Sequence, residues 1–195
     1  MPGARRARRL FIAVEIPSEV RAAVEVAMTP WRAALPGVRW VPPANLHVTV
    51  RFLGPVPAEL EDEVSSSVEA AVATVAPFAT RLDGVGAFPS PARARVLWAG
   101  LDDRSGRMGA LATALDAALA PAFGTEVREF RPHLTVARCD PPSRLPAAFA
   151  ATSLDPVPFE VVRAVVFQSV PGGGGPRYEP LAAHPLGPPV APLVG

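Results

Sequence analysis

A short pattern, His-x-Thr with apolar residues in the alternate places, occurs twice in this chain and constrains its fold more than any other feature. The two copies are Leu46-His47-Val48-Thr49-Val50 and Pro132-His133-Leu134-Thr135-Val136, and they hold two of the three histidines. Side chains two residues apart along an extended strand point to the same face. Each copy therefore predicts a strand with an imidazole and a hydroxyl on one face and core residues on the other.

The two copies are far apart in the sequence, because 86 positions separate His47 from His133. Only the tertiary fold can bring them together. Internal duplications commonly build a central site from two similar halves, each contributing one strand to a shared cleft. We therefore expect two halves related by a pseudo-twofold axis, with the motif strands at the centre.

Length and composition indicate one domain in two lobes, because 195 residues that are 49% hydrophobic suffice for a real core. No apolar run reaches the roughly 18 residues that cross a bilayer, and the N-terminus lacks a secretory apolar stretch. The single cysteine, Cys139, fits a reducing compartment. We expect a soluble, cytoplasmic protein with a flexible basic N-terminus at 1–8, one domain at 9–185 and a flexible Pro-rich tail at 186–195.

All nineteen basic residues are arginine, and the chain contains no lysine. A P-loop lysine, a Schiff base and the lysyl-nucleotidyl intermediate of ATP-dependent nucleic-acid ligases are therefore excluded. The net charge of +1 also argues against a polycation that coats nucleic acid nonspecifically. Any preference for phosphate must be local.

Hydrophobic periodicity and turn residues predict alternating strands and helices along the chain. A loop of four glycines near the end is interpreted as a plain connection between strands, because no helix pattern follows it. Helices are expected from Ser18 toward Trp31, over 57–75, and over 104–120, the last stopped by Pro121; strands are expected over 10–14, 38–41, 46–53, 78–85, 95–100, the second motif, 161–170 and 177–181.

Two imidazoles facing one substrate suit displacement at phosphorus, where one takes a proton from the attacking oxygen and the other gives one to the leaving oxygen. Histidine titrates near pKa ~6.5, so modest shifts allow one neutral and one charged ring. Thr49 and Thr135 could donate hydrogen bonds to phosphoryl oxygens. The motifs are nearly symmetric, so the residues alone leave open which histidine is the acid.

Charged residues near the motifs offer further binding groups. Arg51, four residues after His47, is expected on the same strand face and could add positive charge, although a solvated arginine fits equally well. Arg131, near His133, could likewise add positive charge, although a solvated arginine fits equally well. The carboxylates show no metal-binding spacing, and His184 lies close to the tail, so neither a metal site nor a cofactor is expected. A serine hydrolase is excluded by the lack of Gly-x-Ser-x-Gly.

Beyond the motifs, the chain resembles the two-histidine (2H) phosphoesterases, and within them the bacterial and archaeal RNA 2′,3′-cyclic phosphodiesterases, also described as 2′-5′ RNA ligases. The resemblance extends over residues 9–185. It rests on the opening Arg9-Leu10-Phe11-Ile12-Ala13-Val14 with Pro17, on the stretch from Asn45 to Gly54, and on the stretch from Phe130 to Arg138. It implies a bilobal α+β fold with antiparallel sheets around a central cleft and helices outside.

The resemblance also implies roles. His47 would be the proton donor to the leaving 3′ oxygen, His133 the proton acceptor that activates water, and the two motif threonines the phosphate-binding groups. Tyr178 and Phe11 could stack on a base, although packing roles fit both residues better.

The function expected is metal-independent hydrolysis of a terminal RNA 2′,3′-cyclic phosphate to a 2′-phosphomonoester. The substrate would be RNA with that terminus or a small cyclic nucleotide, with no membrane or protein partner implied. Two alternatives remain: 2′-5′ ligation or 2′-5′ phosphodiester cleavage in the same site, and a module that binds RNA ends without catalysis.

Overall fold

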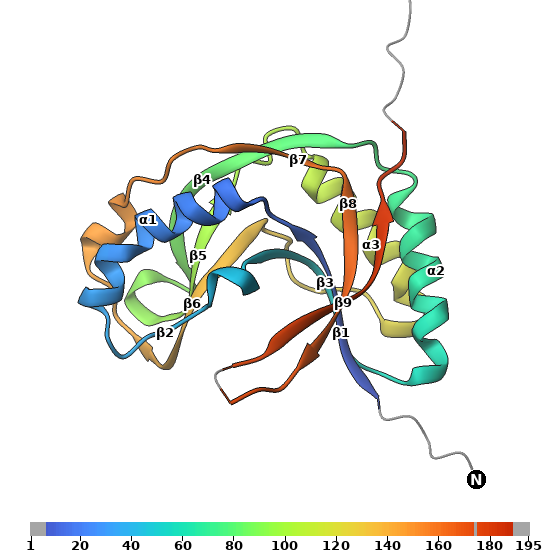
Figure 1. The fold of residues 1–195 in the computed structure, drawn as a ribbon, viewed down its shortest axis with the longest axis horizontal. Coiled ribbons are helices and arrows are strands. Elements are labelled where there is room, and N and C mark those ends of the chain that lie inside the picture. The colour runs from blue at the N-terminus through green and yellow to red at the C-terminus, as the bar shows by residue number, and fades with distance from the viewer. Residues whose placement is uncertain (1–6, 174, 189–195) are drawn as a thin grey trace, which may run out of the picture.

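Nine strands form one curved sheet in the computed structural model, which describes residues 7–173 and 175–188 (Figure 1). The strand order is β7-β4-β5-β6-β3-β1-β8-β9, with β2 paired to β6, and all neighbouring strands are antiparallel. The strands are β1 (Arg8–Glu15), β2 (Arg39–Trp40), β3 (His47–Val56), β4 (Phe78–Phe88), β5 (Ala94–Leu101), β6 (His133–Ser143), β7 (Pro158–Val161), β8 (Arg163–Val170) and β9 (Arg177–Pro185). The α-helices are α1 (Ser18–Ala34), α2 (Glu61–Val72) and α3 (Arg107–Phe123).

Two lobes meet at the centre of the sheet, where β3 and β6 pair through Val48 and Leu134. Helices α2 and α3 pack on the lobe built from β3, β1, β8 and β9 (Figure 1). Helix α1 follows β1 in sequence but covers the other lobe, where the Arg32 guanidinium lies 5.0 Å from the ring centre of Trp40 on β2. The expected bilobal α+β fold is confirmed. Helix α1 follows a strand of one lobe but packs on the other lobe.

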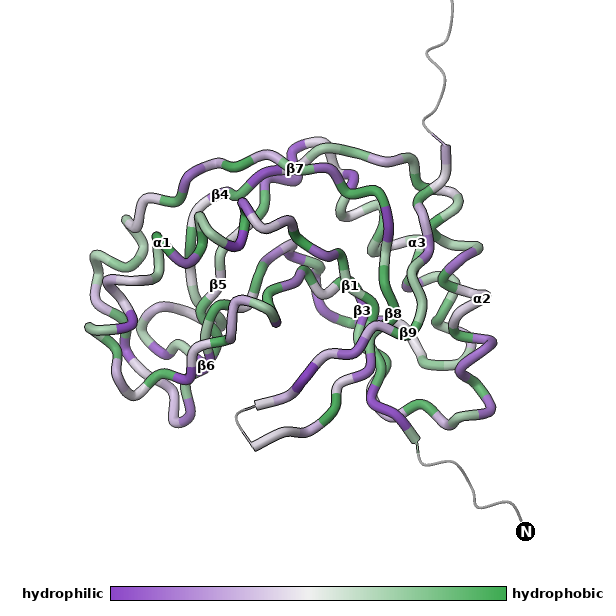
Figure 2. The backbone as a smooth tube through the Cα atoms, in the orientation of Figure 1, coloured by the Kyte–Doolittle hydropathy of each residue, from purple (hydrophilic) through white to green (hydrophobic). Residues whose placement is uncertain are grey.

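In the lobe built from β3, β1, β8 and β9, side chains on both faces of β1 are buried. Leu10, Ile12 and Val14 of β1 join the main core, whereas Phe11 and Ala13 join a small second cluster that contains Val165, Phe167 and Tyr178. Figure 2 shows the corresponding hydrophobic stretches along the central strands. Burying one large apolar side chain contributes about 1.5–3 kcal/mol. The second cluster supports the cleft side of the sheet.

The third helix differs from its predicted bounds at both ends. It begins at Arg107, because the Asp103 carboxylate accepts the backbone N–H groups of Met108 at 2.8 Å and Gly109 at 2.9 Å. Pro121 lies in its last turn, where the missing N–H breaks only one bond, and the helix ends at Phe123 before Gly124, whose φ is +71°.

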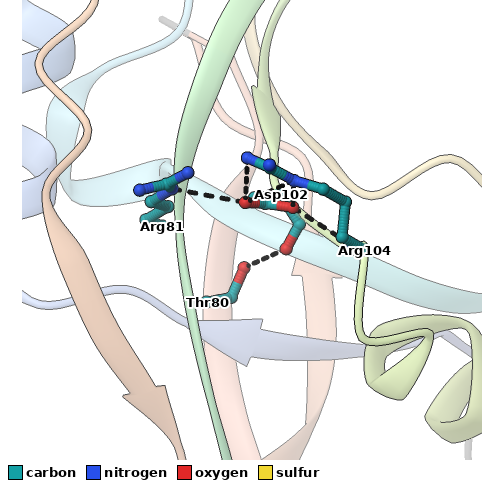
Figure 3. A network of polar contacts seen from close by, with 4 residues as sticks. All are labelled: Thr80, Arg81, Asp102 and Arg104. Atoms are coloured by element: carbon teal, nitrogen blue, oxygen red, sulfur yellow. Dashed lines mark hydrogen bonds and ion pairs between the residues drawn. The ribbon is translucent and has the colours of Figure 1, made fainter.

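A polar network fixes the connection from β5 to α3. Asp102 accepts hydrogen bonds from Arg104, forms an ion pair with Arg81, and receives the Thr80 hydroxyl on its carbonyl oxygen (Figure 3). The hydrogen bonds from Arg104 lower the pKa of Asp102 to about 2. The carboxylate therefore stays ionised at neutral pH and holds the start of the helix against β4.

Three expected boundaries, one near the start of the chain and two in its last part, are corrected by the structure. The predicted strand over 161–170 is divided at Val162 into β7 and β8. Strand β1 already begins at Arg8, which pairs with Val56. The expected flexible tail starts with packed residues, because Leu186 is buried and the Gly187 N–H lies within hydrogen-bonding distance of the carbonyls of Val72 and Val75, at 3.1 and 2.9 Å. Residues 1–6 and 189–195 lie outside the described part. Within that part, no helix is long and apolar enough to span a membrane.

Candidate active site

The two motif strands lie side by side, as their repetition predicts. Since β3 and β6 are antiparallel with Val48 opposite Leu134, each histidine lies across from the threonine of the other motif. The four side chains line one cleft of about 890 Å³ between the lobes. All four were predicted from the repeated pattern, and the fold brings them together.

Both imidazoles are oriented by the main chain in the same way. The Nδ1 atom of His47 lies 2.7 Å from the Asn45 carbonyl oxygen, and that of His133 lies 2.6 Å from the Arg131 carbonyl oxygen. A carbonyl can only accept a hydrogen bond, so each Nδ1 carries the proton and donates it. The Nε2 atoms are therefore the positions that gain and lose protons, which matches an acid and base pair.

The Nε2 atom of His47 lies 2.9 Å from the hydroxyl oxygen of Thr49. When this ring is neutral, Nε2 accepts the Thr49 proton. When the ring is protonated, Nε2 donates, and the hydroxyl proton becomes available to another acceptor. The charge on the histidine therefore controls what the threonine can donate to a bound anion.

Burial holds both rings neutral in the free protein. It lowers the pKa of His47 to about 4; the bond to the Asn45 carbonyl opposes this effect, and the charge of Arg138, with that of His133 whenever its ring is protonated, adds to it. Burial also lowers the pKa of His133, again assisted by Arg138. A bound anion would act in the opposite direction and favour the charged rings. Proton uptake is therefore coupled to filling the cleft.

Aromatic side chains support each ring. The centre of the His47 ring lies 5.0 Å from that of Phe11 and 4.9 Å from that of Tyr178, which meets it edge-on. The centre of the His133 ring lies 5.1 Å from that of Phe88. Phe11 is 3% exposed, so it packs against the buried side of the His47 ring. Burial raises the pKa of the Tyr178 hydroxyl.

A β-bulge corrects the expected placement of Arg51. Ile12 pairs with Arg51 and Ala13 with Thr49, so β3 contains one extra residue and both Val50 and Arg51 are buried. The Arg51 guanidinium forms ion pairs with Asp116 at 3.2 Å and Glu126 at 3.5 Å, and it donates to the Gly124 carbonyl oxygen. It lines the cleft, but it is engaged in fixing the end of α3 to the motif strand.

Arg131 is also engaged, because its guanidinium forms an exposed ion pair with Glu129 at 2.8 Å. Its contribution to the site is its carbonyl oxygen, which orients His133. Neither arginine predicted from the sequence is therefore without a carboxylate partner.

Arg138 is a cleft arginine on a motif strand that sequence reasoning missed. Leu97 pairs with Ala137 and Trp98 with Thr135, so β6 has a bulge at the same place in its motif as β3. After each bulge, the residue five positions beyond the histidine returns to the cleft face. This residue is Phe52 after His47 and Arg138 after His133. In each motif strand the bulge shows as two adjacent buried residues, Val50 and Arg51 in β3 and Val136 and Ala137 in β6.

No group of three or more histidine, cysteine, aspartate or glutamate side chains that could hold a metal ion occurs within residues 7–173 and 175–188. The third histidine lies apart from the cleft on β9, where His184 Nε2 is 3.1 Å from the Ser65 hydroxyl.

Comparisons with known proteins agree with this architecture. Residues 17–172 match the model of the 2′-5′ RNA ligase superfamily. A Thermus thermophilus protein named RNA 2′,3′-cyclic phosphodiesterase is 35% identical over 80% of this chain and 81% of its own length. A Geobacillus stearothermophilus protein of the same name is 30% identical over 90% of this chain, and the alignment spans 56% of that relative.

Solved structures show the same fold. A crystal structure of a Thermus thermophilus protein matches with a TM-score of 0.80 and 32% identity, covering 93% of this chain and all of that one. E. coli LigT complexed with 3′-AMP matches with a TM-score of 0.76 and 28% identity, covering 92% and 98%. The match of fold, family model and paired motifs shows that this chain belongs to the 2′-5′ RNA ligase superfamily, a family of 2H phosphoesterase enzymes.

Proposed function

We propose that the protein hydrolyses the 2′,3′-cyclic phosphate at the end of an RNA chain to a 2′-phosphomonoester, without a metal ion. One observation carries the proposal. Each motif histidine has its Nδ1 proton committed to a main-chain carbonyl, which leaves one Nε2 atom per lobe to exchange protons at a shared cleft. The name of the relatives, RNA 2′,3′-cyclic phosphodiesterase, supports hydrolysis of a cyclic phosphodiester.

The reaction needs one proton on the pair. His133 Nε2 takes a proton from water as its oxygen bonds to phosphorus, and His47 Nε2 gives a proton to the leaving 3′ oxygen as the phosphorus–oxygen bond breaks. Water adds across the ring, and the phosphate remains on the 2′ oxygen. The Nε2 atom of His133 has no hydrogen-bond partner among the described residues, whereas that of His47 lies beside the Thr49 hydroxyl, which supports His133 as the base.

Charge develops on the phosphoryl oxygens during this step, and donors already surround them. The Thr49 and Thr135 hydroxyls face the same volume, and Arg138 supplies the positive charge. Binding of the anionic substrate raises the pKa of the imidazoles, so His47 takes up its proton in the complex. The Nε2 atom of the resulting imidazolium no longer accepts the Thr49 proton, so the Nε2 proton is available to the leaving 3′ oxygen and the hydroxyl proton to a phosphoryl oxygen.

The proposal is tested with purified protein and adenosine 2′,3′-cyclic phosphate in the presence of a chelator. We expect turnover to the 2′-phosphate, identified by its phosphorus NMR signal. His47→Ala and His133→Ala should each lower kcat by about 10²- to 10⁴-fold, with the double variant little worse than either single variant. His184→Gln is the matched control, because that histidine lies outside the cleft.

Three results would contradict the proposal. Absence of turnover with cyclic nucleotides and with oligonucleotides that end in a cyclic phosphate would favour a module that only binds RNA ends. Loss of activity in the chelator would contradict the metal-free step. A joined 2′-5′ linkage as the main product would assign the site to ligation.

A further inference from the structure

The cleft extends well beyond the histidines, toward the N-terminal end of β1. There it is lined by Arg9 of β1, Phe52 of β3 and Ser169 of β8. We propose that this extension is a second phosphate site, in which Arg9 binds the backbone phosphate one or two nucleotides upstream of the cyclic phosphate. This inference rests on the proposed function and makes an RNA oligonucleotide, rather than a free cyclic nucleotide, the preferred substrate.

The register of β1 places Arg9 on the cleft face. Phe11 and Ala13, at positions of the same parity, belong to the cluster beside the cleft, and Arg9 pairs with Ser169, another cleft residue. The neighbouring Arg8 points to the opposite face, where it forms an ion pair with Glu61 of α2 at 3.0 Å. Strand alternation therefore sends one arginine into the helix layer and the next into the cleft.

Charge pairing distinguishes the arginines of the cleft. Five arginines and three carboxylates line it, a surplus of two positive charges. The three carboxylates are taken by Arg51 and Arg131. Among the described residues, Arg9, Arg128 and Arg138 form no ion pair. An unpaired guanidinium in a cleft suits a phosphate, to which it can donate two hydrogen bonds.

Spacing separates Arg9 from the catalytic phosphate. Thr49 lies opposite Ala13, and Arg9 lies four residues nearer the N-terminus of β1, a Cα separation of about 13 Å at about 3.3 Å per residue. Arg138 already serves the phosphate at the histidines. An arginine at this distance along the strand is placed for a different phosphate, so the cleft matches a chain with more than one.

An exposed aromatic ring lies between the two charged positions. Phe52 pairs with Phe11, and its side chain is 58% exposed although the residue is apolar. Every base has a face that stacks on such a ring, so the contact tolerates any sequence. Along β1 and β3 the imidazole pair is followed by an aromatic ring and then by an arginine. These groups match, in order, a phosphate, a base and a second phosphate of an RNA chain.

The experiment compares adenosine 2′,3′-cyclic phosphate with a trinucleotide ending in the same cyclic phosphate, using wild type, Arg9→Gln and Arg8→Gln. We expect kcat/KM of the wild type to be about ten- to a hundred-fold higher for the trinucleotide, from one charge-assisted contact. Arg9→Gln should lose most of this preference while its kcat/KM for the mononucleotide stays within about twofold. Arg8→Gln should keep the preference, because its side chain faces α2.

Salt dependence provides a second readout. For a single-stranded ligand, each phosphate contact contributes about 0.7 to the slope of log affinity against log salt. Arg9→Gln should therefore flatten the slope for the trinucleotide by about 0.7 relative to Arg8→Gln. The same slope can be measured without turnover, by fluorescence anisotropy of a labelled trinucleotide that ends in a 2′-phosphate.

Equal kcat/KM for both substrates in the wild type would overturn the inference, as would an equal loss on both in Arg9→Gln. If neither substrate is hydrolysed, the proposed reaction fails, and anisotropy then decides the second site alone. Weaker trinucleotide binding in Arg9→Gln than in Arg8→Gln would support the site, and identical binding would refute it.

Discussion

Replacing His47, whose ring is buried in the cleft, should change how the free energy of unfolding depends on pH. Burial lowers the pKa of His47 to about 4, whereas a histidine in the unfolded chain titrates near 6.5. Between these values the unfolded chain binds a proton that the folded protein does not bind. His47→Gln removes this difference and keeps a side chain of similar polarity that can still form hydrogen bonds.

The sign and size follow from linkage. The folded pKa is depressed, so the stabilising contribution is fully present above pH 6.5 and is lost as the pH falls toward 4. The gap between 6.5 and about 4 corresponds to at most about 3 kcal/mol, because each pKa unit is worth about 1.36 kcal/mol. The ring is partly accessible from the cleft, so solvent reduces this figure.

Urea unfolding followed by tryptophan fluorescence at pH 7, 5 and 4 provides the measurement, with His184→Gln as the control. On moving from pH 7 to 4, the free energy of unfolding of His47→Gln should rise relative to wild type, by up to about 3 kcal/mol. The carboxylates titrate in both proteins and cancel in the difference, and the coupling of His133 to His47 is among the smaller causes of the lowered pKa. Parallel curves within about 0.5 kcal/mol across this range would refute the assignment of a buried, neutral His47.

Further predictions concern catalysis and the parts that position it. Since both imidazole pKa values are lowered in the free protein, the pH profile of kcat/KM should peak below pH 6.5. The profile of kcat should peak at a higher pH, because bound substrate raises the pKa of the imidazoles. Profiles of kcat and kcat/KM that coincide above pH 7 would contradict this prediction. Arg138→Gln should raise the pKa of His47 and His133, measured by proton NMR of the rings, while lowering kcat/KM by about ten- to a hundred-fold. Arg51→Gln should lower the free energy of unfolding by about 1–3 kcal/mol, because it leaves Asp116 unpaired, against less than about 1 kcal/mol for the exposed Arg131→Gln. Asn45→Ala removes the bond that the Asn45 side-chain amide donates to the Pro176 carbonyl at 2.8 Å but keeps the main-chain carbonyl that orients His47. The variant should show faster limited proteolysis between β8 and β9 with the pKa of His47 unchanged, and equal cleavage rates would contradict the tether.

Local periodicity was enough to predict the chemical pair. Alternation in Leu-His-Val-Thr-Val and Pro-His-Leu-Thr-Val predicts which side chains face the core, and Val48 and Leu134 are indeed buried. The lack of lysine narrowed the possible chemistry further, because it excludes every mechanism that needs a lysyl amine. The predictions from alternation succeed because a strand of five residues leaves little room for the register to change.

Tertiary structure decided what surrounds that pair. The bulge in β3 places Arg51 opposite Ile12 of the main core, so Arg51 is buried in the wall of the cleft beside Asp116 and Glu126, and the matching bulge in β6 returns Arg138 to the cleft face. A bulge forms only when a neighbouring strand imposes its register, which no local pattern contains. The amino-acid sequence by itself determined the two histidines and their hydroxyls, and only the pairing of β3 and β6 with their neighbours decided which arginine faces them.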